Sequence, residues 1–142
     1  MSDIPVAVVV SVPEKYFPDD DDTCLTAGKF VCGRLESHLI QHGHKVADWI
    51  HGGCEEDWGV YFESQKADEL FDYNICFFPD AVGKVQCLMV VQYHLKVPFL
   101  KRLFKKPRQL GMDHHMHHTM REFGSTFTSS RILTQSQFDA EI

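Results

Sequence analysis

The chain has 142 residues, of which 44% are hydrophobic and 24% charged, and its formal net charge at pH 7 is −6. A chain of this length fits one domain, predicted over residues 1–142, and this composition excludes general disorder. An acidic balance also disfavours a nucleic-acid binder, which usually carries a basic domain.

The first part of the chain predicts a strand and then a helix. Residues 4–12 are rich in valine, which is typical of a strand. Residues 24–42 carry apolar side chains at every fourth position, so they predict a helix with one apolar face. These positions are Ala27, Val31, Leu35 and Leu39. Gly43 follows at once and suits the left-handed conformation that often ends a helix.

The middle of the chain predicts strands joined by short polar turns. These strands are expected at residues 45–50, 58–63, 71–77 and 85–93. The last of them is apolar on both faces, which favours a central position in the sheet. The short connections between them predict an antiparallel meander.

The final part predicts a second helix at residues 108–123, a last strand at 127–133 and a loose polar tail at 134–142. The element order is therefore β-α-β-β-β-β-α-β. Each helix has a single apolar stripe, so both helices should cover the same face of the sheet. We expect an α+β fold with a mainly antiparallel sheet of five to six strands, as a ferredoxin-like variant with an added hairpin.

The start of the chain carries no sign of export or of a membrane anchor. Its apolar run, Val6 to Val10, is too short for a signal-peptide core or for a membrane span. We therefore expect a cytoplasmic protein with no membrane partner. The five cysteines include no Cys-x-x-Cys pair, which predicts free thiols in a reducing compartment.

Histidine is concentrated in the segment Asp113-His114-His115-Met116-His117-His118. On a helix, His114 and His118 share one face, as do His38 and His42 on the first helix. Imidazole is the commonest ligand of transition metals in proteins. One interpretation is therefore a metal site of His38, His42, His114 and His118; the other is a set of exposed imidazoles that bind no metal. We favour the second and expect no cofactor.

Cys54 lies in a glycine turn beside His51, which could indicate a cysteine nucleophile. Three acids follow it directly, and their field would raise the pKa of the thiol and make it less reactive. No phosphate-binding glycine motif and no Gly-x-Ser-x-Gly elbow occurs. The sequence thus favours a protein that is not an enzyme.

Charge is unevenly distributed along the chain. Residues 96–108 contain six of the fourteen Lys and Arg and no acid, so the rest of the chain carries a formal charge of −12. Acids gather in two runs, whose members are Asp19, Asp20, Asp21, Asp22, Glu55, Glu56 and Asp57. Since consecutive acids in polar turns stay solvated, we interpret them as a partner-binding surface rather than as a catalytic pair.

Two short motifs resemble small bacterial immunity-like proteins encoded beside secreted toxins. They are His42-Gly-His-Lys-Val46 and Cys54-Glu-Glu-Asp-Trp-Gly59. The later segment Phe99-Leu-Lys-Arg-Leu-Phe104 is similar to the loop that follows a central strand in such families. The resemblance implies stoichiometric inhibition of a protein partner and carries over no functional residue.

The expected function is therefore that of an immunity or inhibitor protein that neutralises a cognate bacterial toxin or enzyme through its acidic surface. One alternative is a histidine-rich metal-binding protein or a metal-dependent enzyme. Another is a phage-type inhibitor whose acids imitate nucleic-acid phosphates.

Overall fold

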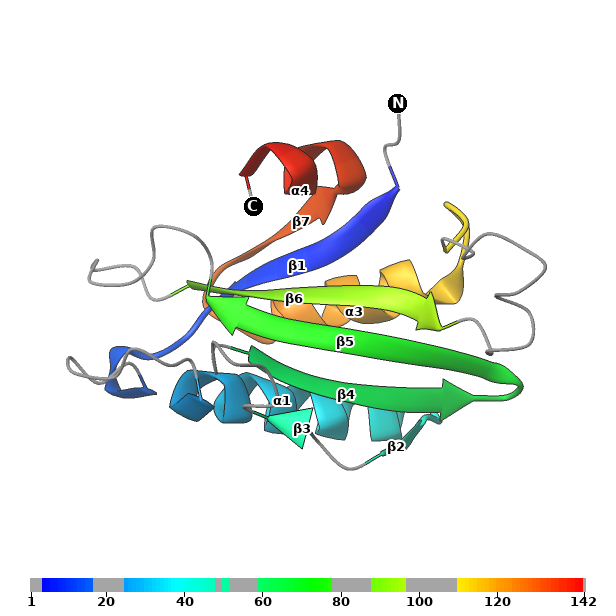
Figure 1. Cartoon of the computed structure of the whole chain (residues 1–142), viewed down its shortest axis with the longest axis horizontal. Helices are drawn as coiled ribbons and strands as arrows, with labels where there is room; N and C mark the ends of the chain where they lie inside the picture. Colours follow the sequence, from blue (N-terminus) through cyan, green and yellow to red (C-terminus); the bar gives the residue numbers. More distant parts are fainter. Residues whose placement is uncertain are drawn as a thin grey trace.

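A computed structural model describes residues 4–16, 25–47, 50–51, 59–77, 88–96 and 110–141. The strands are β1 (Pro5–Ser11), β2 (Lys45–Val46), β3 (Ile50–His51), β4 (Gly59–Lys66), β5 (Glu69–Phe77), β6 (Leu88–Lys96) and β7 (Ser130–Thr134). The helices are the 3-10 turn η1 (Glu14–Tyr16) and the α-helices α1 (Leu25–Gln41), α3 (His115–Ser125) and α4 (Gln135–Glu141). Figure 1 shows their arrangement.

The described strands form one antiparallel sheet in the order β2-β4-β5-β6-β1-β7, and β3 also pairs with β4. Strand β6 therefore lies between β1 and β5, and β1 lies between β6 and β7. This is the strand order of a split β-α-β, ferredoxin-like sheet, which β4 extends beyond β5. The predicted α+β class and antiparallel sheet are confirmed.

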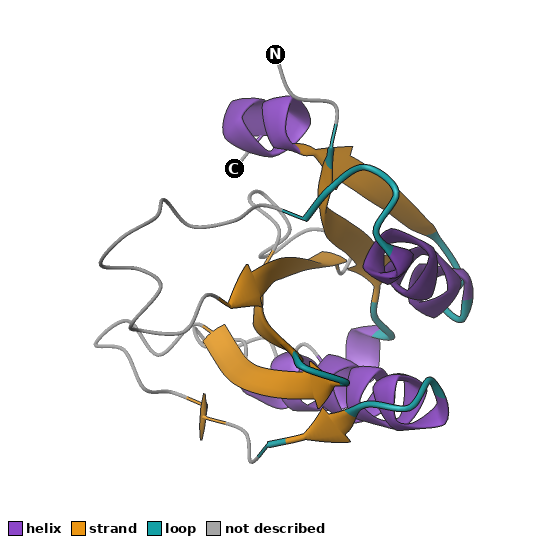
Figure 2. Cartoon of the chain, turned by 90° about the vertical axis from the view of Figure 1, so that its right-hand side faces the viewer, coloured by secondary structure: helices purple, strands orange, loops and turns teal. Residues whose placement is uncertain are grey.

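Helices α1 and α3 cover the same face of the sheet, as predicted (Figure 2). The apolar stripe of α1, including Leu35 and Leu39, packs in one buried cluster with Met120 and Phe123 of α3. The central strand β6 contributes side chains to both faces, since Val91 belongs to this cluster and Val90 to the one on the opposite face. The central position predicted for residues 85–93 is therefore correct for their described part.

The opposite face of the sheet is covered in part by α4. Phe138 of this helix packs against a second buried cluster that contains Ala7, Val9 and Leu133. Arg131 pairs with Glu141, and this contact ties the last turn of α4 to β7. Residues 135–141, for which the sequence predicted a loose tail, form helix α4, and Phe138 anchors this helix on the second buried cluster.

Local chemistry explains where the helices begin and end. Gly43 follows α1 with φ +87°, the left-handed conformation predicted for it. The second long helix was predicted from residue 108 but begins at His115, because the His114 side chain accepts a hydrogen bond from the Met116 backbone N–H and acts as N-cap. The close packing of α1 on β4 depends on Gly28, where a Cβ would lie 2.7 Å from Val60 Cγ2.

Candidate functional site

Histidines from two helices meet on the surface of the layer formed by α1 and α3. His38 lies in the last turn of α1, and His42 follows directly after the helix. Their rings are 4.3 Å apart between centroids. Across the gap, α3 presents the Thr119 carbonyl and the Glu122 carboxylate. The segment after α1 and the middle of α3 are therefore joined by polar side chains at this point.

The hydrogen bonds of His38 and His42 fix which ring nitrogen carries a proton. His38 Nε2 lies 2.8 Å from the Thr119 carbonyl oxygen, and His42 Nδ1 lies 2.8 Å from the His38 carbonyl oxygen. Since a carbonyl can only accept, each of these nitrogens donates. The lone pair of a neutral ring is then on His38 Nδ1 and on His42 Nε2. Burial lowers the pKa of His38, which favours its neutral form.

Glu122 joins His42 to a third histidine. His42 Nε2 lies 3.0 Å from Glu122 Oε2, and His118 Nε2 lies 2.6 Å from Glu122 Oε1. The hydrogen bond from His42 and the neighbouring imidazoles hold the pKa of Glu122 below its usual value, so the carboxylate is ionised at neutral pH. One carboxylate thus serves two imidazoles, one on each oxygen.

The spacing within this cluster is that of metal ligands. One ligand atom each from His38, His42 and Glu122 lies within 4.8 Å of the other two. We call these three residues the interhelical cluster. His118, which is largely exposed, borders it through Glu122.

A second group of similar composition lies at the start of α3. Here Glu69 of β5 approaches His114 and His115, again with ligand atoms within 4.8 Å of one another. His114 Nε2 lies 3.1 Å from both Glu69 oxygens, while His114 Nδ1 accepts from the Met116 backbone N–H. Both nitrogens of His114 are therefore used in stabilising the start of α3, and neither offers a free lone pair.

His117 is buried, and both of its ring nitrogens form hydrogen bonds within the fold. Its Nε2 donates to the Gly111 carbonyl at 2.8 Å, so its Nδ1 accepts from the Tyr93 hydroxyl at 2.9 Å. Burial lowers the pKa of His117, in agreement with a neutral ring that is satisfied on both sides. His117 is therefore a structural histidine.

His44 is likewise buried, with Nδ1 3.0 Å from the Ser64 hydroxyl, which in turn lies 2.7 Å from the Tyr73 hydroxyl. Burial, with smaller effects from Lys66 and neighbouring histidines, lowers the pKa of His44 to about 4. Among the described cysteines, burial raises the pKa of Cys32 and brings that of Cys76 to about 11. These thiols are protonated and unreactive at neutral pH.

Three of the four histidines that the sequence grouped for metal binding are brought together by the fold. His38, His42 and His118 meet around Glu122, whereas His114 lies with Glu69 at the start of α3. His114 does not join the other three, because its ring caps α3 and lies against Glu69. Glu122 was missing from the predicted set, although it follows His118 at i+4 on the same helix face.

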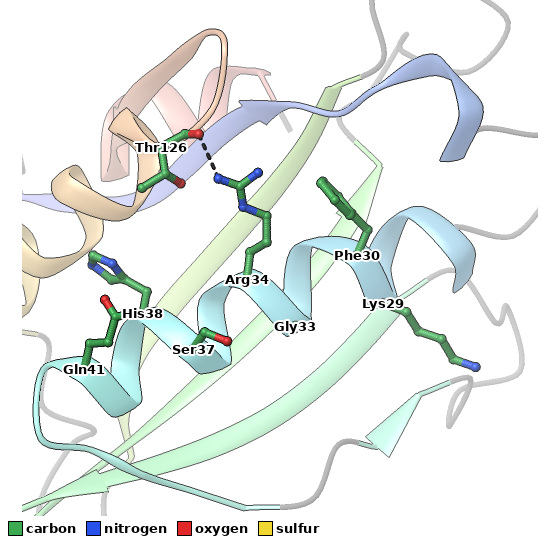
Figure 3. Close-up of a pocket in the computed structure, with 8 residues that line it drawn as sticks. All are labelled: Lys29, Phe30, Gly33, Arg34, Ser37, His38, Gln41 and Thr126. Carbon is green, nitrogen blue, oxygen red and sulfur yellow. Dashed lines mark hydrogen bonds between the residues drawn. The ribbon is translucent and has the colours of Figure 1, made fainter.

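A groove of about 450 Å³ continues from His38 along the outer side of α1 (Figure 3). It is lined by Lys29, Phe30, Gly33, Arg34, Ser37, His38, Gln41 and Thr126. The Arg34 guanidinium crosses it, donates to the Thr126 carbonyl at 2.8 Å and lies over the Phe127 ring. The groove is thus lined by two cationic side chains, Lys29 and Arg34, of which Arg34 is held in place by these contacts.

The predicted partner-binding acids Asp19 to Asp22 and Glu55 to Asp57 lie outside the described residues, as do Cys54 and all of the basic segment except Lys96. The described residues that flank the two acidic runs can be placed. The first run lies between η1 and α1, and the second between β3 and β4.

The register of the sheet puts both attachment points at one end. Gly59 pairs with Cys76, Cys76 with Val90 and Val90 with Val9, so β4 begins at the end of the sheet where β1 finishes. Figure 1 shows η1 and the first turn of α1 at this same end. Lys96, where the basic segment starts, pairs with Leu70 at the opposite end.

Comparisons of the chain with protein-family models, with curated proteins and with solved structures found no match. Among the described helices, none has the length and apolar character needed to cross a membrane.

Proposed function

We propose that the protein is a non-enzymatic binding protein of the immunity or inhibitor type, which neutralises a toxin or enzyme through its acidic residues. The observation that carries the proposal is the common attachment of two acidic runs at one end of the sheet. Asp19 to Asp22 and Glu55 to Asp57 are more than thirty residues apart in sequence, yet the described elements that flank them lie at the same end of the sheet (Figure 1).

The attachment points of the oppositely charged segments on the sheet support this assignment. The basic segment begins at Lys96, at the end of the sheet opposite to the described residues that flank the acidic runs. A surface with one sign of charge steers a partner of opposite charge and accelerates association. Fast association suits an inhibitor that must act before its target does. The two acidic runs would thus bind a basic surface of the partner protein.

The chemistry of the described residues also supports binding rather than turnover. The buried His117 is held on both ring nitrogens by a hydroxyl and a carbonyl, and the described thiols are protonated. A general base or nucleophile requires a reactive group poised for transfer, and these side chains are engaged in the fold instead.

The test is complex formation with the purified products of the neighbouring genes. We expect one of these products to co-elute with the protein in size-exclusion chromatography and its activity to be lost in the complex. The association rate should fall with ionic strength, since exposed charges are screened by salt. If no neighbouring product forms a complex, the proposal fails.

Charge-neutralising variants locate the surface. Replacement of Glu55, Glu56 and Asp57 by Gln, Gln and Asn should weaken the complex by about 10-fold or more, because complementary charges set the association rate. A matched control replaces three acids elsewhere, Asp68, Asp113 and Asp139, by Asn and should change affinity by less than about 2-fold. Equal losses in both variants would show that net charge, and not this surface, drives binding.

If the partner is a nuclease, a competition experiment tests whether the acids imitate nucleic-acid phosphates. If the acids imitate phosphates, nucleic acid and the protein should compete for the same site on the nuclease. The variant of Glu55, Glu56 and Asp57 should then compete less well than the unchanged chain. A complex that forms equally well on a nucleic-acid-bound nuclease excludes mimicry while it retains the inhibitor assignment.

A further inference from the structure

We propose that His38, His42 and Glu122 form a binding site for one divalent transition-metal ion of the zinc type, with His118 as an outer hydrogen-bond donor to Glu122. The inference goes beyond the inhibitor function and does not depend on the acidic runs. It is carried by the geometry and hydrogen bonding of the interhelical cluster.

The hydrogen bonds of His38 and His42 are those of metal-binding histidines. Such a histidine usually donates its second ring N–H to a carbonyl or carboxylate, which fixes the tautomer and aims the free lone pair at the ion. His38 donates to the Thr119 carbonyl and His42 to the His38 carbonyl, both at 2.8 Å. Each therefore has one nitrogen left, and on His42 that nitrogen faces a carboxylate.

The contact between His42 Nε2 and Glu122 Oε2 requires a positive centre between two electron-rich atoms. Without a metal ion, a proton must fill that position, because His42 Nδ1 already donates to the His38 carbonyl and the two facing atoms otherwise present only lone pairs. Zinc can replace the proton, because two ligands of a tetrahedral zinc lie ~3.4 Å apart when their bonds are about 2.0–2.1 Å long. The observed distance is 3.0 Å, so a small shift of two partly exposed side chains admits the ion.

Glu122 carries a charge and an outer support that suit a ligand. His118 holds Glu122 Oε1 at 2.6 Å, while Oε2 lies 3.0 Å from His42 Nε2. Carboxylates that bind metals are commonly hydrogen-bonded in this way. Two imidazoles and a carboxylate prefer borderline ions such as Zn²⁺ to Ca²⁺ or Mg²⁺. Three protein ligands leave a fourth position for water or for a donor from another molecule.

The group of Glu69, His114 and His115 serves as an internal control, since it has the same residue types at the same spacing. His114 cannot offer a lone pair without losing the cap on the Met116 N–H. The proposal therefore assigns the ion to one of the two groups only, and the two can be separated by mutation.

The experiment uses the untagged full-length chain after treatment with a chelator. Titration with Zn²⁺ by calorimetry, and with Co²⁺ by its visible absorption, should give one equivalent of bound ion. Replacement of His38, His42 or Glu122 by Gln should weaken binding by about 100-fold, since loss of an outer partner alone costs ~10–100-fold. His118→Gln should weaken it by about 10-fold.

Two control variants complete the design. The double variant His114→Gln/His115→Gln disables the second group, and His94→Gln removes a half-exposed imidazole that lies 3.2 Å from Asp72. Both variants should leave affinity within about 2-fold of the unchanged chain, because the three replaced residues belong to other contacts than the proposed ligands. Glu122→Gln alters an exposed side chain and should stay folded, which circular dichroism verifies.

The proposal is overturned if the unchanged chain binds Zn²⁺ no more tightly than His42→Gln. It is also overturned if the His114→Gln/His115→Gln variant loses as much affinity as His42→Gln. Failure here leaves the inhibitor assignment untouched, because complex formation is measured on a different surface and without added metal.

Discussion

Two groups of the same residue types border α3 but have different roles: one is Glu69, His114 and His115, and the other is the interhelical cluster. At the start of the helix, His114 caps the Met116 N–H and donates to Glu69. Near its end, His42 and His118 share Glu122, and His38 and His42 each keep one ring nitrogen free of backbone partners. Residue type and spacing therefore do not decide whether a histidine is a potential ligand. That depends on whether its hydrogen bonds leave one ring nitrogen with a free lone pair.

The largest expected effect concerns His117, which belongs to neither group. His117→Ala should lower the free energy of unfolding by about 3 kcal/mol, because the buried Tyr93 hydroxyl and the Gly111 carbonyl would both lose their partner and a cavity would remain. Urea unfolding measures this change. His118→Ala is the control and should cost less than about 0.5 kcal/mol at an exposed position. Equal losses in the two variants would contradict the structural assignment of His117.

The next effect is a loss of stability in acid that originates from His44. Its pKa is about 4 in the folded chain, below the ordinary value of 6.5. Both states are neutral at pH 7, but the unfolded chain takes up a proton as the pH falls below 6.5 and the folded chain does so only near pH 4. Stability should therefore fall by about 2 kcal/mol between pH 7 and pH 5 from this residue alone.

The variant His44→Gln isolates that contribution. Its stability between pH 7 and pH 5 should fall less steeply than that of the unchanged chain, whatever the substitution costs at pH 7. Some slope should remain, because the pKa values of His38, His115 and His117 are also lowered by burial. An unchanged slope would show that His44 does not titrate as its surroundings require.

The smallest expected effect tests the capping role of His114. His114→Ala should destabilise the protein by about 1 kcal/mol, the usual cost of a lost N-cap. His114→Asn should recover most of that loss, since Asn is a strong N-cap residue. Thermal unfolding followed by circular dichroism measures both. If Asn is as destabilising as Ala, capping is not the task of His114, and its ring would have to be reconsidered as a ligand.

Much of the fold could be predicted from periodicity. The apolar repeat of α1, the alternation in β4 and β5 and the doubly apolar β6 define their own elements, because each side chain must face either the core or water. Gly43 marks the end of α1 through its conformational freedom. The start of α3 was predicted too early, since the capping role of His114 depends on a side-chain rotamer that a residue pattern does not contain.

The tail shows a second limit. Its polar composition predicted a loose segment, yet one aromatic residue, Phe138, packs on the second face of the sheet and α4 forms around it. A single apolar contact leaves no periodic signal in the sequence, so only the surface against which it packs reveals it.

Local patterns of polarity were sufficient to predict the α+β class, the buried faces of the long helices and the uneven distribution of charge. The sequence also supplied the histidine pairs at i, i+4. The tertiary structure alone decided that His42 and His118 meet at Glu122 while His114 turns away. It also decided that the elements flanking both acidic runs lie at one end of the sheet. Contacts between residues some eighty positions apart depend on how the helices pack, and no local pattern encodes that.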